Sequence, residues 1–170
     1  MVKPMAGVIY TIGYGNNSRE QFFERVRVLG ATHIVDVRSR PFSKYKKEFD
    51  RGDLDVAATQ AGFKYVYLGD RLGGMPDRED LLIDGRADHS KMRRDPLYKA
   101  AIQRVVDAVH QGKILVLMCG CAEPIPCHRG RLLSPDLETH GILVQHEVGG
   151  LLIGQKEAEL KTGQDQSSLF

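Results

Sequence analysis

Short apolar runs alternate with amphipathic segments along the chain, and this alternation predicts an α/β fold. The first run, residues 8–12 (VIYTI), is rich in β-branched and aromatic side chains, as is typical of a strand. Ser18 and Gln21 then match a capping box that opens a helix. Its apolar stripe comprises Phe22, Phe23, Val26 and Leu29. Residues 33–37 (HIVDV) predict a second strand, and the whole unit predicts a βαβ motif with parallel strands.

The same alternation continues towards the C-terminus. Three further apolar runs predict strands, at residues 64–68, 114–118 and 142–146. Three more segments predict helices, from Asp53 to Ala61, from Asp95 to Gly112, and from about His128 to Gly141 with a break near Pro135. The middle helix has an apolar stripe of Leu97, Ala101, Val105 and Val109. Residues 39–52 and 69–95 predict loops, the second unusually long.

Strands that alternate with helices predict a three-layer α/β sandwich. We expect a Rossmann-like architecture with a mostly parallel central sheet of about five strands. A chain of 170 residues favours one domain, which we place at residues 1–163, followed by a flexible polar tail over residues 164–170.

Composition and charge narrow the possible partners. The net charge of +2 is too small to predict polyanion binding unless basic residues cluster locally. No apolar run approaches the roughly 20 residues of a membrane helix, so we expect no membrane partner. The three cysteines are odd in number and all fall within residues 119–127, which argues against a secreted disulfide framework. We therefore expect a soluble, cytoplasmic protein.

Polar side chains that could take part in catalysis or ligand binding follow the predicted strands. Ligands of open parallel sheets bind beyond the carboxyl ends of the strands, so these side chains are expected to share one rim. The predicted catalytic residues are Asp36, Cys119, Cys127 and His128. The predicted substrate-binding residues are Gly13, Tyr14, Gly15, Asn16, Ser18, Arg38, Ser39, Arg40, Gly73, Gly74 and Arg129, among which the arginines could hold phosphate or carboxylate.

The segment from Cys119 to Arg129 (CGCAEPIPCHR) is the most distinctive local feature. A thiol that follows a buried strand and faces arginines and a helix N-terminus should have a lowered pKa, whereas free cysteines are also common as small core residues. We predict no cofactor. Zinc is the alternative, with Cys119, Cys121, Cys127 and His128 as ligands, although the adjacency of Cys127 and His128 would strain a shared ion. A phosphatase-type C-x₅-R loop is absent, because Cys127 stands where Cys121 would need an arginine.

A glycine loop after the first strand supports another alternative. Gly13, Gly15 and Ser18 resemble a dinucleotide fingerprint without its third glycine, and Asp36 follows at about the right distance. Nicotinamide or flavin binding is therefore a further possibility.

Four motifs in order resemble the uncharacterised DUF488 family across nearly the whole chain. They are Thr11-Ile-Gly13-Tyr14-Gly15-Asn16, Asp36-Val-Arg38-Ser39-x-Pro41-x-Ser43, Tyr65 with Leu72-Gly73-Gly74, and Cys119-x-Cys121…Cys127-His128-Arg129. The resemblance implies a compact α/β domain and no particular reaction. Family members often have Cys-Ala-Glu in the last motif, where this chain has Cys121 at the glutamate position, and many have His where Tyr14 stands.

Three functions remain open on this basis. The first is an enzyme, a hydrolase or transferase, that acts on an anionic nucleotide-like or nucleic-acid substrate. The second is a metal- or redox-responsive binding module that uses the cysteines. The third is a nicotinamide- or flavin-dependent oxidoreductase.

Overall fold

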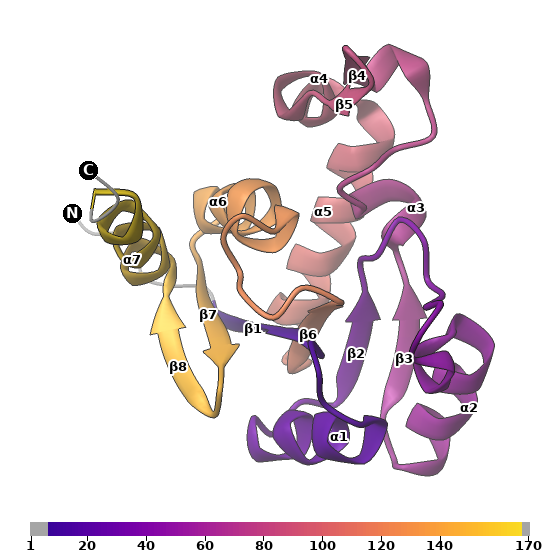
Figure 1. Cartoon of the computed structure of the whole chain (residues 1–170). Helices are drawn as coiled ribbons and strands as arrows, with labels where there is room; N and C mark the ends of the chain where they lie inside the picture. The colour runs from indigo at the N-terminus through magenta and orange to yellow at the C-terminus, as the bar shows by residue number, and fades with distance from the viewer. Residues whose placement is uncertain (1–6, 168–170) are drawn as a thin grey trace.

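A six-stranded sheet forms the centre of the molecule (Figure 1). The structure is a computed structural model that describes residues 7–167. The strand order is β3–β2–β6–β1–β7–β8. Five strands run parallel: β1 (Gly7–Gly13), β2 (His33–Asp36), β3 (Lys64–Tyr67), β6 (Leu115–Cys119) and β7 (Ile142–Val148). Only β8 (Leu151–Gly154), at one edge, is antiparallel to its neighbour. The predicted mostly parallel sheet is confirmed.

Helices cover both faces of the sheet, which confirms the three-layer sandwich. Helices α1 (Arg19–Val28) and α2 (Arg51–Gln60) contribute to one core cluster, and α5 (Pro96–His110) and α6 (Ser134–Thr139) contribute to the other. Because side chains alternate along a strand, Ile34 of β2 belongs to the first cluster and Val35 to the second. The central strand β6 is buried at all five positions, as expected for a strand covered on both sides.

Two predicted helix starts are confirmed by their caps. The Ser18 hydroxyl accepts a hydrogen bond from the Gln21 amide at 3.2 Å, and the Gln21 side chain accepts one from the Ser18 amide at 2.9 Å. Asp95 caps α5 by accepting from the Tyr98 amide at 3.1 Å, with Pro96 at the first helical position. The predicted stripe of α5 is wrong at Leu97, which is 44% exposed, because Tyr98 turns inward instead.

The predicted long loop over residues 69–95 contains four short elements. They are α3 (Gly69–Leu72), a 3₁₀ turn at Glu79–Leu81, a hairpin of β4 (Leu82–Ile83) and β5 (Arg86–Ala87), and α4 (His89–Arg94). The hairpin turns at Asp84 and Gly85, whose φ angles are 51° and 73°. An Asp-Gly pair between strands is a known hairpin signal, so this element was readable from the sequence.

Other boundaries also differ from the prediction. Helix α2 begins at Arg51 rather than at Asp53, after a 3₁₀ turn at Lys47–Phe49. The predicted helix from His128 is divided into a π-helical turn, η3 (Arg129–Leu133), and α6, in which Pro135 occupies the first turn because proline needs no amide donor there.

The sequence analysis missed the two C-terminal elements. Strand β8 follows a tight turn at Gly149 and Gly150, both with positive φ. Helix α7 (Gln155–Ser167) overlaps the tail predicted over residues 164–170, of which residues 168–170 lie outside the described chain. No helix in residues 7–167 has the length and apolar character to cross a membrane.

Candidate functional site

A hollow of about 400 Å³ lies at the carboxyl ends of β2 and β6. We call it the thiol hollow. Its lining comprises Arg38, Ser39, Arg40, Gly74, Met75, His89, Cys119, Cys121, Pro126, Cys127, His128 and Arg131. The segment after β2 and the segment after β6 therefore share one cavity, as the strand-end rule predicts. Three arginines line the hollow, and no Asp or Glu of the described chain does.

The three cysteines converge at this hollow as free thiols. Their sulfur atoms all lie within 4.8 Å of one another. Cys119 is the last residue of β6 and is buried, as is Cys127, whereas Cys121 is exposed on the loop between them. Thiols that are up to eight residues apart in the sequence thus form one compact group, which could act as metal ligands or nucleophiles.

His128 is oriented by the backbone of β2. Its Nε2 lies 2.9 Å from the carbonyl oxygen of Val37. Because a carbonyl only accepts, Nε2 must carry the proton, and Nδ1 of the neutral ring then has a free lone pair. Nδ1 lies 3.6 Å from Sγ of Cys127, so it can take the thiol proton. The arrangement is that of a cysteine nucleophile with an adjacent base.

The charges around Cys127 favour its thiolate form. Hydrogen bonds from Cys119 and Cys121 lower the pKa of Cys127, and His128 and the nearby Arg129 lower it further against the effect of burial. Burial opposes a charge on His128, but the sulfurs of Cys119 and Cys127 outweigh it and raise the pKa of His128 to about 10. Both shifts favour the thiolate of Cys127 and the imidazolium of His128.

Cys121 shows the opposite behaviour although it is the exposed thiol. Its hydrogen bonds to the sulfurs of Cys119 and Cys127 raise the pKa of Cys121, and partial desolvation of the thiol raises it further. The opposite directions of the two shifts favour the negative charge on Cys127 and the protonated thiol at Cys121.

Arg129 is a buried cation beside this thiolate. It is 0% exposed and forms no ion pair with a carboxylate of the described residues. Its Nη1 donates to the Thr11 hydroxyl at 2.9 Å, and its Nη2 donates to the Cys121 carbonyl at 2.8 Å. A buried cation is costly without a counter-charge, and the Cys127 thiolate supplies one.

A buried polar chain holds Arg129 in place, and the sequence analysis missed its members. The Thr11 hydroxyl lies 2.7 Å from His146 Nδ1, and His146 Nε2 lies 2.8 Å from the Gln155 side-chain oxygen. Gln155 in turn donates to the carbonyl of Gly130 at 2.7 Å. Burial lowers the pKa of His146, so the ring is neutral and can accept from Thr11. Isolated His and Gln residues give no sequence signal for such a chain.

Asp36 is placed behind the hollow and not in its lining. It is 0% exposed, and its carboxylate accepts from Arg38 Nε at 2.9 Å, from Arg38 Nη2 at 2.7 Å and from the Tyr65 hydroxyl at 2.5 Å. These bonds occupy the carboxylate and fix the guanidinium of Arg38. Asp36 therefore orients Arg38, and its predicted catalytic role has no geometric support.

Arg38 is left with one unused donor group. Its Nη2 also donates to the Phe49 carbonyl at 2.8 Å, whereas the buried Nη1 has no hydrogen-bond partner among the described residues. Asp36 raises the pKa of Arg38 despite the opposing effect of burial, so the side chain stays charged. Because Nη1 is buried, Arg38 acts on the adjoining hollow through its fixed charge and not through this donor.

The predicted glycine loop after β1 lies outside the lining of the hollow. The amides of Tyr14 and Gly15 donate to the carbonyls of Cys119 and Gly120, at 3.1 and 3.2 Å. These two amides are thus not free to cradle a pyrophosphate, which counts against the dinucleotide interpretation.

The other residues of that loop have structural roles. A Cβ atom at Gly13 would lie 1.5 Å from the Cys121 carbonyl oxygen, so glycine lets the thiol loop cross β1. Tyr14 stacks on Phe49, Ser18 caps α1, and the Asn16 carbonyl accepts from Lys46.

The long loop after α3 covers one side of the hollow. The Ser39 hydroxyl accepts from the Met75 amide at 2.8 Å and so anchors this loop. Glycine is required beneath it, because a Cβ atom at Gly73 would meet Ser39 Oγ at 2.1 Å and one at Gly74 would meet the His128 ring at 2.9 Å. The structure adds His89 and Arg131 to the lining, which strand-end reasoning had not placed there.

The sulfur group also has the composition of a zinc site. Tetrahedral zinc with Cys and His ligands brings neighbouring ligand atoms to about 3.5 Å from one another. The 3.6 Å between Cys127 Sγ and His128 Nδ1 fits that distance, so adjacency does not prevent these side chains from sharing an ion. His128 stands outside the set whose ligand atoms all lie within 4.8 Å, which leaves three thiols and one position open to the hollow.

Comparison with known proteins identifies a family. No curated protein and no solved structure matches the chain. Residues 18–134, more than half of the chain, match DUF488, a domain of unknown function, and this range includes every residue that lines the thiol hollow. The chain therefore belongs to the DUF488 family.

Proposed function

We propose that the protein is a thiol-dependent enzyme that acts on an anionic, phosphate-bearing substrate of nucleotide type. The observation that carries the proposal is the lining of the hollow, in which a thiolate–imidazolium pair lies among three arginines with no carboxylate. Arginine binds phosphate oxygens through two parallel hydrogen bonds and retains its charge at all working pH values. The volume of about 400 Å³ falls within the range of small-molecule sites.

The residues would divide the work as follows. The exposed Arg40 and Arg131 would bind the phosphate group, and the fixed charge of Arg38 would attract it. Cys127 Sγ would attack phosphorus and form an S–P bond while the ester P–O bond breaks. His128 would give its proton to the departing oxygen. Water would then attack phosphorus, return its proton to His128 and release inorganic phosphate with the thiolate restored.

Phosphate release measures this activity directly. We expect the protein to release phosphate from a nucleoside monophosphate, and we expect Cys127→Ser to abolish release while the Tm stays within a few degrees of the wild type. Arg131→Gln should raise KM because it removes a phosphate contact, whereas Lys99→Gln, on the exposed surface of α5, should change neither constant. Absence of release from nucleotides and from p-nitrophenyl phosphate would refute the proposal.

A zinc site is the second candidate, favoured by the convergence of three sulfurs within 4.8 Å. Cys119, Cys121 and Cys127 would hold the ion, and the fourth position would face the hollow or accept His128. Bound zinc would keep the thiolates in their charged form and would occupy Cys127.

Metal analysis separates the two candidates. Protein purified under reducing conditions without chelator should contain well under one zinc per chain if Cys127 is a free nucleophile. One tightly held zinc per chain, lost in Cys121→Ser, would establish the metal site and overturn the nucleophile. Both candidates require reduced thiols, and we therefore propose a cytoplasmic location.

A further inference from the structure

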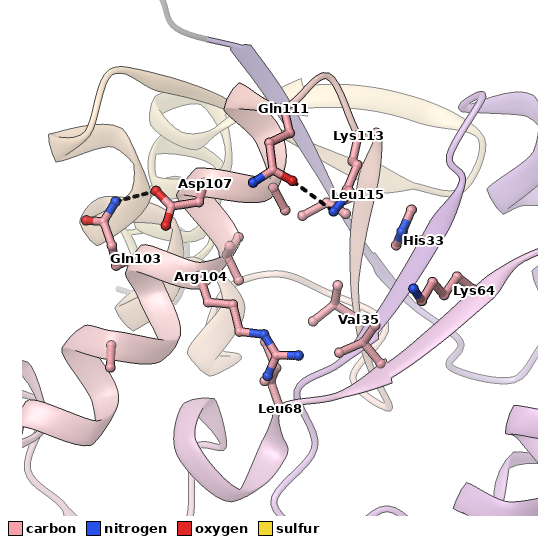
Figure 2. A pocket seen from close by; sticks show the side chains of 14 residues that line it. His33, Val35, Lys64, Leu68, Gln103, Arg104, Asp107, Gln111, Lys113 and Leu115 are labelled. Atoms are coloured by element: carbon pink, nitrogen blue, oxygen red, sulfur yellow. Dashed lines mark hydrogen bonds between the residues drawn. The ribbon is translucent and has the colours of Figure 1, made fainter.

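A second cavity, of about 500 Å³, lies beside α5 and shares no residue with the thiol hollow (Figure 2). We call it the basic groove. It runs between the exposed flank of α5 and the strands β2, β3 and β6. Strand β3 is the edge of the sheet, and α5 leaves part of the face of β2 and β3 uncovered.

The floor of the groove is apolar. It is made by side chains from three strands, one helix and the residue that follows β3: Val35, Val66, Leu115, Val105, Ala108 and Leu68. Four of these, Val35, Leu68, Val105 and Leu115, belong to the buried core cluster on this face of the sheet. An apolar floor of this size can hold an aliphatic chain or an aromatic ring.

The rim of the groove is positively charged. Lys64 and Lys113 stand at the starts of β3 and β6, and Arg104 extends from α5 on the opposite side (Figure 2). Arg104 and Lys64 form no ion pair with any described residue, and Lys113 bonds only to the neutral Gln111 side chain, at 3.0 Å. Asp107 is the one acidic residue of the lining, and it accepts a hydrogen bond from Gln103 at 2.7 Å.

The positive potential of the rim affects the pKa of His33. Burial lowers the pKa of His33, and the charges of Lys113 and Lys64 lower it further. Formal charges of the lining sum to +2, from three cations and one anion with His33 neutral. The groove therefore combines an apolar interior with an excess of cations that lack counter-ions.

We propose that the basic groove binds a small organic anion with an apolar body, such as a medium-chain or aryl carboxylate. The apolar body would cover the floor, and the anionic group would pair with Arg104 or with Lys64 and Lys113. A second copy of the chain is a poor occupant, because a two-fold contact at this face would bring like charges together. The apolar floor and the excess positive charge of the rim both suit a small amphiphilic anion.

Decanoate is a suitable probe, and methyl NMR of the full chain can follow its binding. We expect decanoate to shift the methyl signals of Val35, Val66 and Leu115, and we expect decan-1-ol, which has no charge, to bind more weakly. Exposed ion pairs contribute modestly, so Arg104→Gln and Lys64→Gln should each weaken binding by about twofold to fivefold. All three substituted positions, including the control Lys99→Gln, are exposed, so the variants should fold.

The possible outcomes are decisive. The proposal is supported if the shifts map to the groove and Lys99→Gln binds decanoate as the wild type does. It is overturned if decanoate shifts only signals around the thiol hollow, if Lys99→Gln weakens binding as much as Arg104→Gln, or if the signals change with protein concentration alone, which would indicate a second copy. Because the two cavities share no residue, failure of the groove proposal would leave the proposed phosphate release intact.

Discussion

The thiol hollow and the basic groove are both lined by cations, yet they hold them in different ways. At the hollow, the lining residue Arg38 is 5% exposed and fixed by Asp36. Arg129 lies outside the lining, fully buried beside Cys127. In the groove, Arg104 and Lys64 are exposed and unpaired above an apolar floor. Fixed cations next to a nucleophile can stabilise a transition state without reorganising, whereas exposed cations without a partner can attract an anion but do not fix its position. The comparison shows that charge alone does not distinguish a reactive site from a binding site.

The largest expected effect is the loss of folding stability when one arginine is replaced in each cavity. Arg38→Met leaves the Asp36 carboxylate buried without its partner, and we expect the free energy of unfolding to fall by about 3–5 kcal/mol. Arg104→Met removes an exposed charge, and we expect a change within about 0.5 kcal/mol. Urea unfolding measures both. The double variant Asp36→Asn with Arg38→Met should recover part of the loss, and similar losses in Arg38→Met and Arg104→Met would contradict the distinction.

A smaller effect should follow from a methyl group beneath the hollow. In Gly74→Ala the new Cβ would lie 2.9 Å from the His128 ring, which is anchored to Val37, so we expect a loss of about 1–3 kcal/mol and slower alkylation of Cys127. Gly52→Ala is the matched control, since its Cβ meets no atom within 4 Å and it lies in α2. It should be neutral or stabilising by up to about 1 kcal/mol. Equal effects of the two substitutions would be inconsistent with close packing at Gly74.

The smallest effect is a dependence of stability on pH. Burial lowers the pKa of His146 in the folded chain below its unfolded value of about 6.5. The unfolded chain therefore takes up a proton that the folded chain does not, so the contribution is present above pH 6.5 and is lost as the pH falls. Between pH 7 and pH 5, His146→Gln should lose less stability than the wild type. His33→Gln should behave more like the wild type, because His33 is only partly buried.

Local sequence signals predicted most of the fold. The capping box at Ser18, the Asp95-Pro96 pair and the uniform apolar run of β6 each depend on neighbouring residues, and each is confirmed. The Asp84-Gly85 and Gly149-Gly150 turns were equally local, but the short strands beside them carry few residues on which a period can be recognised.

The site was predictable only in part, because its chemistry depends on contacts between distant segments. The strand-end rule places Arg38 and the cysteines in one region, as the hollow shows. It cannot show that the Asp36 carboxylate is occupied by hydrogen bonds from Arg38 and Tyr65. Nor can it show that Thr11, which contacts His146 135 residues away in the sequence, holds Arg129. Such partners follow from strand register, which no local pattern encodes.

Alkylation of the three cysteines shows which sulfur is the thiolate. Metal-free protein would be treated with limiting iodoacetamide at several pH values, and each modified cysteine would be identified by mass spectrometry. We expect Cys127 to react first although Cys121 is the exposed thiol. Its rate should change little between pH 8.5 and pH 6, because a thiol with a lowered pKa is already a thiolate over this range. Preferential modification of Cys121, with a rate that falls tenfold per pH unit below 8, would contradict the account.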